Sequence, residues 1–221
     1  MDVLLIGGTR FTGPKLVEQL ASSGHQLTLF NRGNHELATD HDVARVSGDR
    51  RNEADVKELF ATRSFDAVVD MCAFEPADVT VLFQADCDPE RYVCYSTAGV
   101  YSETGIVPSR ETDERGKNPF WGTYGTDKAA LEDRLFRAHE ETGFPATVAR
   151  FPYIYGPGNH LYREAALFDR VRADSPVPVP GDGQSLLQFV YVDDVARAVA
   201  DIVQDTTGQS VGEAYNVGEP R

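Results

Sequence analysis

Short apolar runs alternate with amphipathic stretches along most of the chain. An unbroken apolar run predicts a buried strand, whereas apolar residues that recur every three or four positions predict a helix with one buried face. The first helix follows a glycine-rich turn, and we expect Thr12 as its cap and Pro14 in its first turn. We expect strands at 3–6, 26–30, 44–46, 67–70, 91–95 and 146–149, and helices at 15–20, 54–61, 77–85 and 123–141.

The pattern changes after residue 150, where Pro, Gly and Tyr cluster at 152–158. The alternation of strands and helices then resumes, and it predicts an α/β fold: a doubly wound parallel sheet of the Rossmann type with helices on both faces. In this last part we expect a helix at 163–172, a strand at 187–191, a helix at 195–203 that the carboxylates of Asp193 and Asp194 cap, and a strand at 215–218.

The composition adds a strongly acidic surface. The 221 residues include 35 acidic and 21 basic side chains, a net charge of −14. Because such a surface repels phosphates, we expect no nucleic-acid partner. Adaptation to a salty cytosol and an ordinary acidic protein both explain the charge. The sequence shows no signal peptide and no apolar run long enough to span a membrane, so we expect no membrane association. Cys72, Cys87 and Cys94 form no CxxC pair and leave an odd thiol, which predicts a reducing, cytoplasmic location.

The turn after the first strand reads Gly7-Gly8-Thr9-Arg10-Phe11-Thr12-Gly13. A strand, a glycine-rich turn and a helix together present backbone N–H groups to a pyrophosphate. Thr9 stands at the second glycine of the usual Gly-x-Gly-x-x-Gly fingerprint, and Pro14 replaces the lysine that a kinase-type phosphate loop requires. The turn indicates a dinucleotide site, and the alternative is a tight turn that binds nothing.

A second group of candidate residues lies at the start of the predicted long helix and at the end of the fifth strand. Tyr124 and Lys128 are four residues apart, so a helix places them on one face. A nearby cation lowers the pKa of a phenol from about 10 and makes it a plausible acid or base for a hydroxyl or carbonyl. The alternative is an ordinary surface pair. Ser96 and Thr97 end the strand, where parallel sheets bind their ligands.

With these motifs the chain resembles the extended short-chain dehydrogenase/reductase superfamily, the group of nucleotide-sugar epimerases and dehydratases. The tracts at 150–158 and 189–196 are similar to later signatures of that family, and the similarity spans essentially the whole length. The turn is particularly similar to a branch that includes the chloroplast stem-loop RNA-binding proteins. The resemblance implies that Thr97 hydrogen-bonds the substrate oxygen, Tyr124 exchanges a proton with it, and Lys128 lowers the pKa of Tyr124 and holds the nicotinamide ribose.

The sequence departs from that family at two places. Tyr153 stands where relatives usually carry an asparagine that holds the substrate, which weakens the case for a nucleotide-diphosphate sugar. The chain also ends three residues after Tyr-Asn-Val-Gly, whereas relatives continue into a substrate-binding lobe. We therefore expect an NAD(P)-binding Rossmann domain at 1–150, and at 151–221 the end of that core interleaved with a small, truncated C-terminal substrate lobe.

The residues after the second strand indicate the cofactor. NAD sites place an acid there, and a basic residue suits the 2′-phosphate of NADP. Because the chain reads Asn31-Arg32, with Arg10 in reach, we expect NADP, with NAD as the alternative. The full set of expected cofactor contacts is Gly7, Gly8, Thr9, Arg10, Phe11, Thr12, Gly13, Asn31, Arg32, Asp49, Arg50, Met71, Cys72, Ala73, Tyr95, Ser96, Tyr124, Lys128, Phe151 and Ile154.

These residues favour an NADP-dependent oxidoreductase or an epimerase/dehydratase-like enzyme. Its substrate would be a hydroxyl or carbonyl of a small molecule, with sugar nucleotides among the candidates. The alternative is a non-catalytic NADP-sensing or RNA-binding protein on the same fold. Relatives often pair through long helices, so 123–141 is a candidate homodimer surface. We expect no metal, because His25, His35, His41, His139 and His160 show no metal-ligand spacing.

Overall fold

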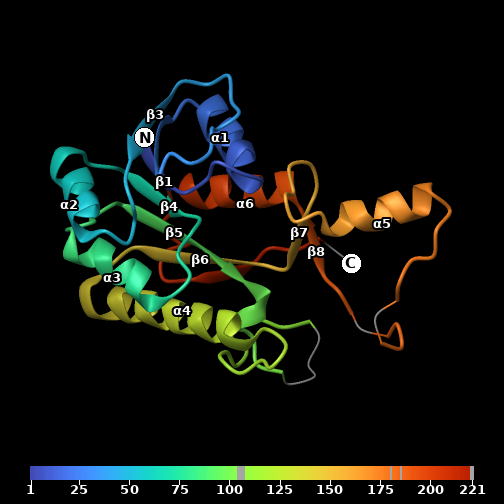
Figure 1. The fold of residues 1–221 in the computed structure, drawn as a ribbon. Helices are drawn as coiled ribbons and strands as arrows, with labels where there is room; N and C mark the ends of the chain where they lie inside the picture. The colour runs from blue at the N-terminus through green and yellow to red at the C-terminus, as the bar shows by residue number, and fades with distance from the viewer. Residues whose placement is uncertain (104–107, 180, 185, 220–221) are drawn as a thin grey trace.

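A single parallel sheet forms the centre of the molecule (Figure 1). The computed structural model describes residues 1–103, 108–179, 181–184 and 186–219. The strand order is β3-β2-β1-β4-β5-β6-β9, and every neighbouring pair is parallel. This order confirms the predicted doubly wound Rossmann sheet. The strands are β1 (Asp2–Ile6), β2 (Gln26–Asn31), β3 (Val43–Ser47), β4 (Ala67–Asp70), β5 (Arg91–Thr97), β6 (Ala146–Phe151) and β9 (Ala214–Asn216).

Helices cover both faces of the sheet (Figure 1). On one face lie α1 (Thr12–Ser22) and α6 (Val192–Val203), and on the other lie α2 (Glu53–Thr62), α3 (Pro76–Gln84) and α4 (Gly122–Thr142). Successive strand residues serve opposite layers: Leu5 packs with α1 and α6, and Leu4 packs with α2, α3 and α4. Strands buried on both faces read as unbroken apolar runs, which is why the sequence located them.

The remaining elements extend from the carboxyl edge of the sheet (Figure 1). Strands β7 (Tyr153–Tyr155) and β8 (Phe189–Tyr191) form a separate parallel pair, and α5 (Arg163–Arg172) lies between them in sequence. None of the side chains of α5 is buried. The sequence did not predict β7, because three residues are too few to show a periodicity. Across the described ranges, no helix combines the length and apolar character that a membrane span requires.

Two expected helix caps are wrong. Helix α1 begins at Thr12 itself, after Phe11, and no side chain caps it. Helix α6 begins after Tyr191, also without a side-chain cap, and Asp193 and Asp194 lie inside its first turn. There the two carboxylates face the positive end of the helix dipole, so they stabilise the helix without bonding to its N–H groups.

Candidate active site

The glycine-rich turn joins β1 to α1 at the point where the strand order reverses. Gly7 and Gly8 have φ angles of +89° and +85°, a region that disfavours other residues. A Cβ at Gly13 would lie 1.9 Å from the carbonyl oxygen of Gly8. The helix therefore starts directly against the strand end, and its first N–H groups lie at the carboxyl edge of the sheet, where open parallel sheets bind their ligands.

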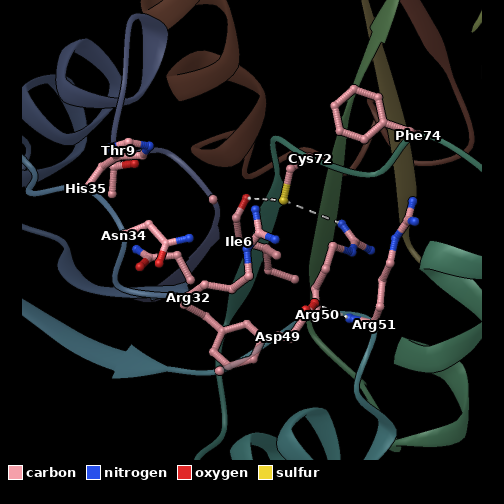
Figure 2. A pocket seen from close by; sticks show the side chains of 14 residues that line it. Ile6, Thr9, Arg32, Asn34, His35, Asp49, Arg50, Arg51, Cys72 and Phe74 are labelled. Carbon is pink, nitrogen blue, oxygen red and sulfur yellow. Dashed lines mark hydrogen bonds between the residues drawn. The ribbon is translucent and has the colours of Figure 1, made fainter.

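A hollow of about 440 Å³ lies beside this turn (Figure 2). The segments that follow β1, β2, β3 and β4 all contribute to its wall. Seven residues expected to contact a cofactor line it: Gly7, Thr9, Asn31, Arg32, Asp49, Arg50 and Cys72. Sequence reasoning missed Asn34, His35, Arg51 and Phe74, which also line it. Their only signal was their position just after a strand, beside residues that had been chosen.

The basic side chains around this hollow have different partners. Arg50 is buried and pairs with Asp70 at 2.5 Å, so it neutralises a buried carboxylate. Arg51 donates to Asp78 at 2.9 Å. Arg10 does not line the hollow; its Nη2 lies 2.5 Å from Nε2 of His35, which does. For Arg32, no hydrogen bond or ion pair is found among the described residues, so it is the arginine best placed to meet an added anion.

The thiol of Cys72 also faces this hollow (Figure 2). Burial raises its pKa to about 11, with a further rise from the charge of Asp70. A thiol with that pKa stays protonated at neutral pH and is a poor nucleophile. Cys72 therefore belongs to the wall of the hollow and not to its chemistry.

Thr97 and Tyr124 meet at the carboxyl end of β5. Tyr124 lies in the first turn of α4 and is 40% exposed. Burial of the phenol raises its pKa, and hydrogen bonding with Thr97 and the charge of Arg163 act in the opposite direction. The Thr97 oxygen accepts from the N–H of Gly99 at 3.1 Å, which leaves its own O–H available to donate.

In this structure the Lys128 ammonium has other partners than Tyr124. Lys128 is buried, and its ammonium donates to the carbonyl oxygens of Ala73 and Tyr95, both at 2.6 Å. The same nitrogen lies 5.0 Å from the ring centre of Phe74, which lines the hollow. The ammonium thus ties the segment after β4 to β5, and its expected effect on the pKa of Tyr124 stays a prediction.

Comparison with known proteins identifies the family. The model of the NAD dependent epimerase/dehydratase family matches residues 3–84 and 79–218. The chain belongs to this family. It is 33% identical over 214 residues to the chloroplast stem-loop binding protein of 41 kDa b from Arabidopsis thaliana, an alignment that covers 91% of this chain and 54% of that protein. It is 24% identical over 215 residues to 2′-dehydrokanamycin reductase from Streptomyces kanamyceticus, covering 96% of this chain and 60% of that protein.

Solved structures show the same epimerase/dehydratase fold. A UDP-glucose 4-epimerase from Thermotoga maritima superposes with a TM-score of 0.84 at 23% identity, over 100% of this chain and 78% of that one. A dTDP-glucose 4,6-dehydratase from Bacillus anthracis, in complex with NAD, gives 0.83 at 21% identity, over 100% and 76%. The chain therefore spans 54% to 60% of the length of these two curated relatives, and about three quarters of the two structures.

Several expected contacts of this epimerase/dehydratase chain lie away from the first hollow. Ser96 donates to the buried Glu132 at 2.5 Å, because it faces the sheet side opposite to Thr97. Phe151 is buried and its ring packs against Tyr95 at 4.9 Å. Ile154 lines a different hollow, with residues of β7, β8 and α5. Met71 packs beneath the turn, where its sulfur would lie 3.0 Å from a Cβ at Gly8.

A buried ionic cluster supports the strand that carries Thr97 and the helix that carries Tyr124. Glu132 of α4 accepts from Arg150 of β6 at 2.7 Å and from Arg115 at 2.6 Å, in addition to Ser96. Arg150 also donates to the carbonyl oxygen of Glu111 at 2.9 Å. The cluster fixes α4 against the sheet and connects Glu111 and Arg115, which precede the helix, to it. Among the residues whose placement the structure gives, no group of His, Cys, Asp and Glu could hold a metal ion.

Proposed function

We propose that this chain is an NADP(H)-dependent enzyme of the reductase or epimerase/dehydratase type, acting on a hydroxyl or carbonyl of a small molecule. One observation carries the proposal: the Tyr124 phenol lies beside the Thr97 hydroxyl, one helical turn from Lys128. The Lys128 ammonium contacts β5 and the segment after β4, and it lies over the ring of Phe74, which lines the first hollow. Family membership supports the reaction class. Sugar nucleotides are the substrates that the resemblance offers first.

The residues at the carboxyl edge fit a dinucleotide cofactor. The turn has no side chain at the three positions where backbone must approach closely, and the first hollow lies directly beside it. Gly7, Gly8 and Gly13 would admit the pyrophosphate, and Arg32 would meet a 2′-phosphate. When bound, the nicotinamide supplies or accepts a hydride.

The chain's own residues would move the proton. With its pKa raised, Tyr124 is protonated at neutral pH and can donate its proton to a carbonyl oxygen as that oxygen gains negative charge. Thr97 would donate a hydrogen bond to the same oxygen. Lys128 would hold the ends of β4 and β5 at a fixed separation, so that Tyr124 and the hollow keep their relative positions.

The molecular setting follows from the same features. We propose that residues 1–150 form the cofactor-binding unit and that 151–221 complete its sheet through β9 and α6 and add part of a substrate lobe. We also propose a cytoplasmic location, since the described cysteines are free thiols. The 33% identity to a stem-loop binding protein favours nucleic-acid binding as a second function. The net charge of −14 opposes it, and RNA filter binding across salt concentrations decides between them.

A variant pair tests the reaction and the cofactor site together. Tyr124→Phe is expected to lower carbonyl reduction or sugar-nucleotide conversion by about 10²- to 10⁴-fold, because the proton donor is lost. The rise in melting temperature with NADP⁺ should stay unchanged, and the exposed Tyr215→Phe serves as the matched control. Equal turnover by Tyr124→Phe and the wild type would remove Tyr124 from the mechanism.

Arg32→Ala reports on the cofactor in the same assay. Loss of a charge-assisted contact to the 2′-phosphate should weaken NADP⁺ binding by about 10- to 100-fold and leave NAD⁺ binding nearly unchanged. Arg137→Ala, on the exposed side of α4, is the matched arginine control. A larger thermal shift with NAD⁺ than with NADP⁺ in the wild-type protein would contradict the NADP assignment.

A further inference from the structure

A second hollow, of about 780 Å³, opens between β7, β8, α5 and the segment before α4. Its volume lies in the range of small-molecule sites, about 300–1,000 Å³. Most of its wall is aromatic or aliphatic, including Phe120, Tyr153, Leu167, Leu187 and Phe189. Leu167, Leu187 and Phe189 are 44%, 58% and 39% exposed, so a large part of each apolar side chain stays open at the hollow.

A row of aromatic rings connects this hollow to the proposed proton donor. The ring centre of Trp121 lies 6.2 Å from that of Tyr124 and 5.7 Å from that of Tyr153. Tyr153 in turn lies 6.0 Å from Phe189, which lies 6.1 Å from Tyr155. Of these rings, Tyr153, Tyr155 and Phe189 line the hollow, and Trp121 lies between Tyr153 and Tyr124. A molecule that rests on the lining rings can therefore extend along the row toward Tyr124. Aromatic walls of this kind bind the flat or cyclic apolar part of a ligand.

The charged groups of the hollow do not suit a diphosphate. Among the described lining residues, the charged side chains are Arg163, Glu164 and Glu219. Arg163 lies over the ring of Tyr153 at 5.4 Å. Glu219 accepts from the Tyr155 hydroxyl at 2.7 Å. Two carboxylates against one guanidinium give this surface a net negative charge, which repels a pyrophosphate.

The second carboxylate is held in place by its neighbours. Glu164 accepts from the N–H of Gly156 at 3.2 Å and from the side-chain amide of Asn159 at 2.8 Å. These contacts keep it ionised, and its pKa is lowered although partial burial works in the opposite direction. The negative charge at the hollow is therefore a fixed part of the wall at neutral pH.

We propose that this hollow is the substrate site and that it takes an uncharged ring compound, an aryl or alicyclic ketone or secondary alcohol, in preference to a sugar nucleotide. The ring body stacks on Tyr153 and Phe189, and the oxygen points past Trp121 to Tyr124. The inference rests on the proposed function for the role of Tyr124. The choice of substrate class rests on the aromatic lining of the hollow and on its charged residues, two carboxylates and one guanidinium.

Trp121 provides a direct readout, because it is the only tryptophan in the chain. The protein saturated with NADP⁺ is titrated with 4-phenylcyclohexanone, which an oxidised cofactor cannot reduce, and separately with UDP-glucose. We expect a saturable change in Trp121 emission with the ketone, with an apparent Kd at least about tenfold lower than that for UDP-glucose. Tighter binding of UDP-glucose, or no saturable change with the ketone, overturns the proposal.

Two matched double variants locate the binding. Leu167→Ser with Leu187→Ser removes apolar surface from the hollow, and Leu161→Ser with Val171→Ser removes comparable exposed surface outside it. The first pair should weaken ketone binding about tenfold, and the second should leave it unchanged. Equal weakening by both pairs overturns the proposal. The proposed function is tested separately by Tyr124→Phe. If that variant loses turnover and keeps the NADP⁺ thermal shift, the proposed function stands even when the substrate proposal fails.

Discussion

The ordinary pKa of a tyrosine phenol, about 10, keeps Tyr124 protonated in the neutral range, and burial of the phenol raises that pKa further. The hydroxyl of Thr97 opposes this rise, since a hydrogen bond donated to the phenolate favours the charged form. The pKa of the proposed proton donor thus depends on two residues of different elements, Thr97 at the end of β5 and Tyr124 at the start of α4. This pair is suited to giving a proton to a carbonyl, and the reverse reaction requires the phenolate.

The pH dependence of the two directions should therefore differ. We expect kcat/KM for carbonyl reduction to be flat through the neutral range and to fall only as pH rises through the pKa of Tyr124. The kcat/KM for oxidation of the corresponding alcohol should rise over the same pH interval. Thr97→Val removes a contact that lowers the pKa of Tyr124. The fall in the reduction rate and the rise in the oxidation rate should therefore both shift to higher pH. Reduction that already declines between about pH 6 and 8 would point to a different acid.

At the level of single residues, the sequence predicted relative positions along an element better than contacts between elements. Spacing alone placed Tyr124 and Lys128 on one helix face, and the structure agrees. The direction of the Lys128 ammonium depends on two carbonyl groups that lie far away in sequence, so no local pattern could reveal it. Ser96 and Thr97 point to opposite sides of the sheet. Ser96 donates a hydrogen bond to Glu132, which belongs to α4.

At the level of elements, the turn from β1 to α1 explains why an irregular fingerprint still builds the site. The positions that need glycine have it: Gly7 and Gly8 have positive φ angles, and Gly13 lies against the backbone of Gly8. Thr9 and Arg10, where the usual motifs have glycine, do not adopt positive φ angles. Phe11 is the one non-glycine residue of the turn with a positive φ angle, +52°. The missing glycines are therefore not required by this backbone.

Gly13→Ala tests that reading of the turn. A methyl group 1.9 Å from the Gly8 carbonyl oxygen forces α1 away from β1. We expect the free energy of unfolding in urea to fall by about 1–3 kcal/mol or more and the thermal shift with NADP⁺ to disappear. Gly218→Ala is the control, because its nearest neighbours are flexible atoms of Gln188 at 3.4 Å or more. Retained NADP⁺ binding by Gly13→Ala would show that the turn is not the pyrophosphate site.

The elements beyond residue 150 mark the limit of sequence reasoning. The helix at 163–172 was predicted with its observed ends, yet none of its side chains is buried. Its amphipathic pattern could not show which surface it would face. Strand β7 and the aromatic row depend on pairing between segments more than thirty residues apart in the chain, Tyr153 with Phe189. Such pairing is visible only in three dimensions.

At the scale of the whole molecule, the charge is distributed unevenly between interior and surface. Buried carboxylates such as Asp70 and Glu132 have arginine partners, Arg50 and Arg150. Each such pair uses one acid and one base, so the excess of 35 acidic over 21 basic side chains remains largely at the surface. The folded state therefore carries self-repulsion that the expanded chain relieves. Salt should matter more for this protein than for one with balanced charge.

The melting temperature is accordingly expected to rise with KCl. The Debye length shortens from about 10 Å at 0.1 M to about 3 Å at 1 M, so repulsion between surface carboxylates is screened over that range. Scans at pH 7 from low to molar KCl measure the effect, and the same scans near pH 4.7, the isoelectric point, are the control, since the net charge vanishes there. Screening predicts a steep rise at pH 7 and little change at pH 4.7. A melting temperature that does not change with KCl at pH 7 would mean that the acidic surface is not an adaptation to salt. If the melting temperature rises equally with KCl at both pH values, the rise comes from a general salt effect on apolar surface.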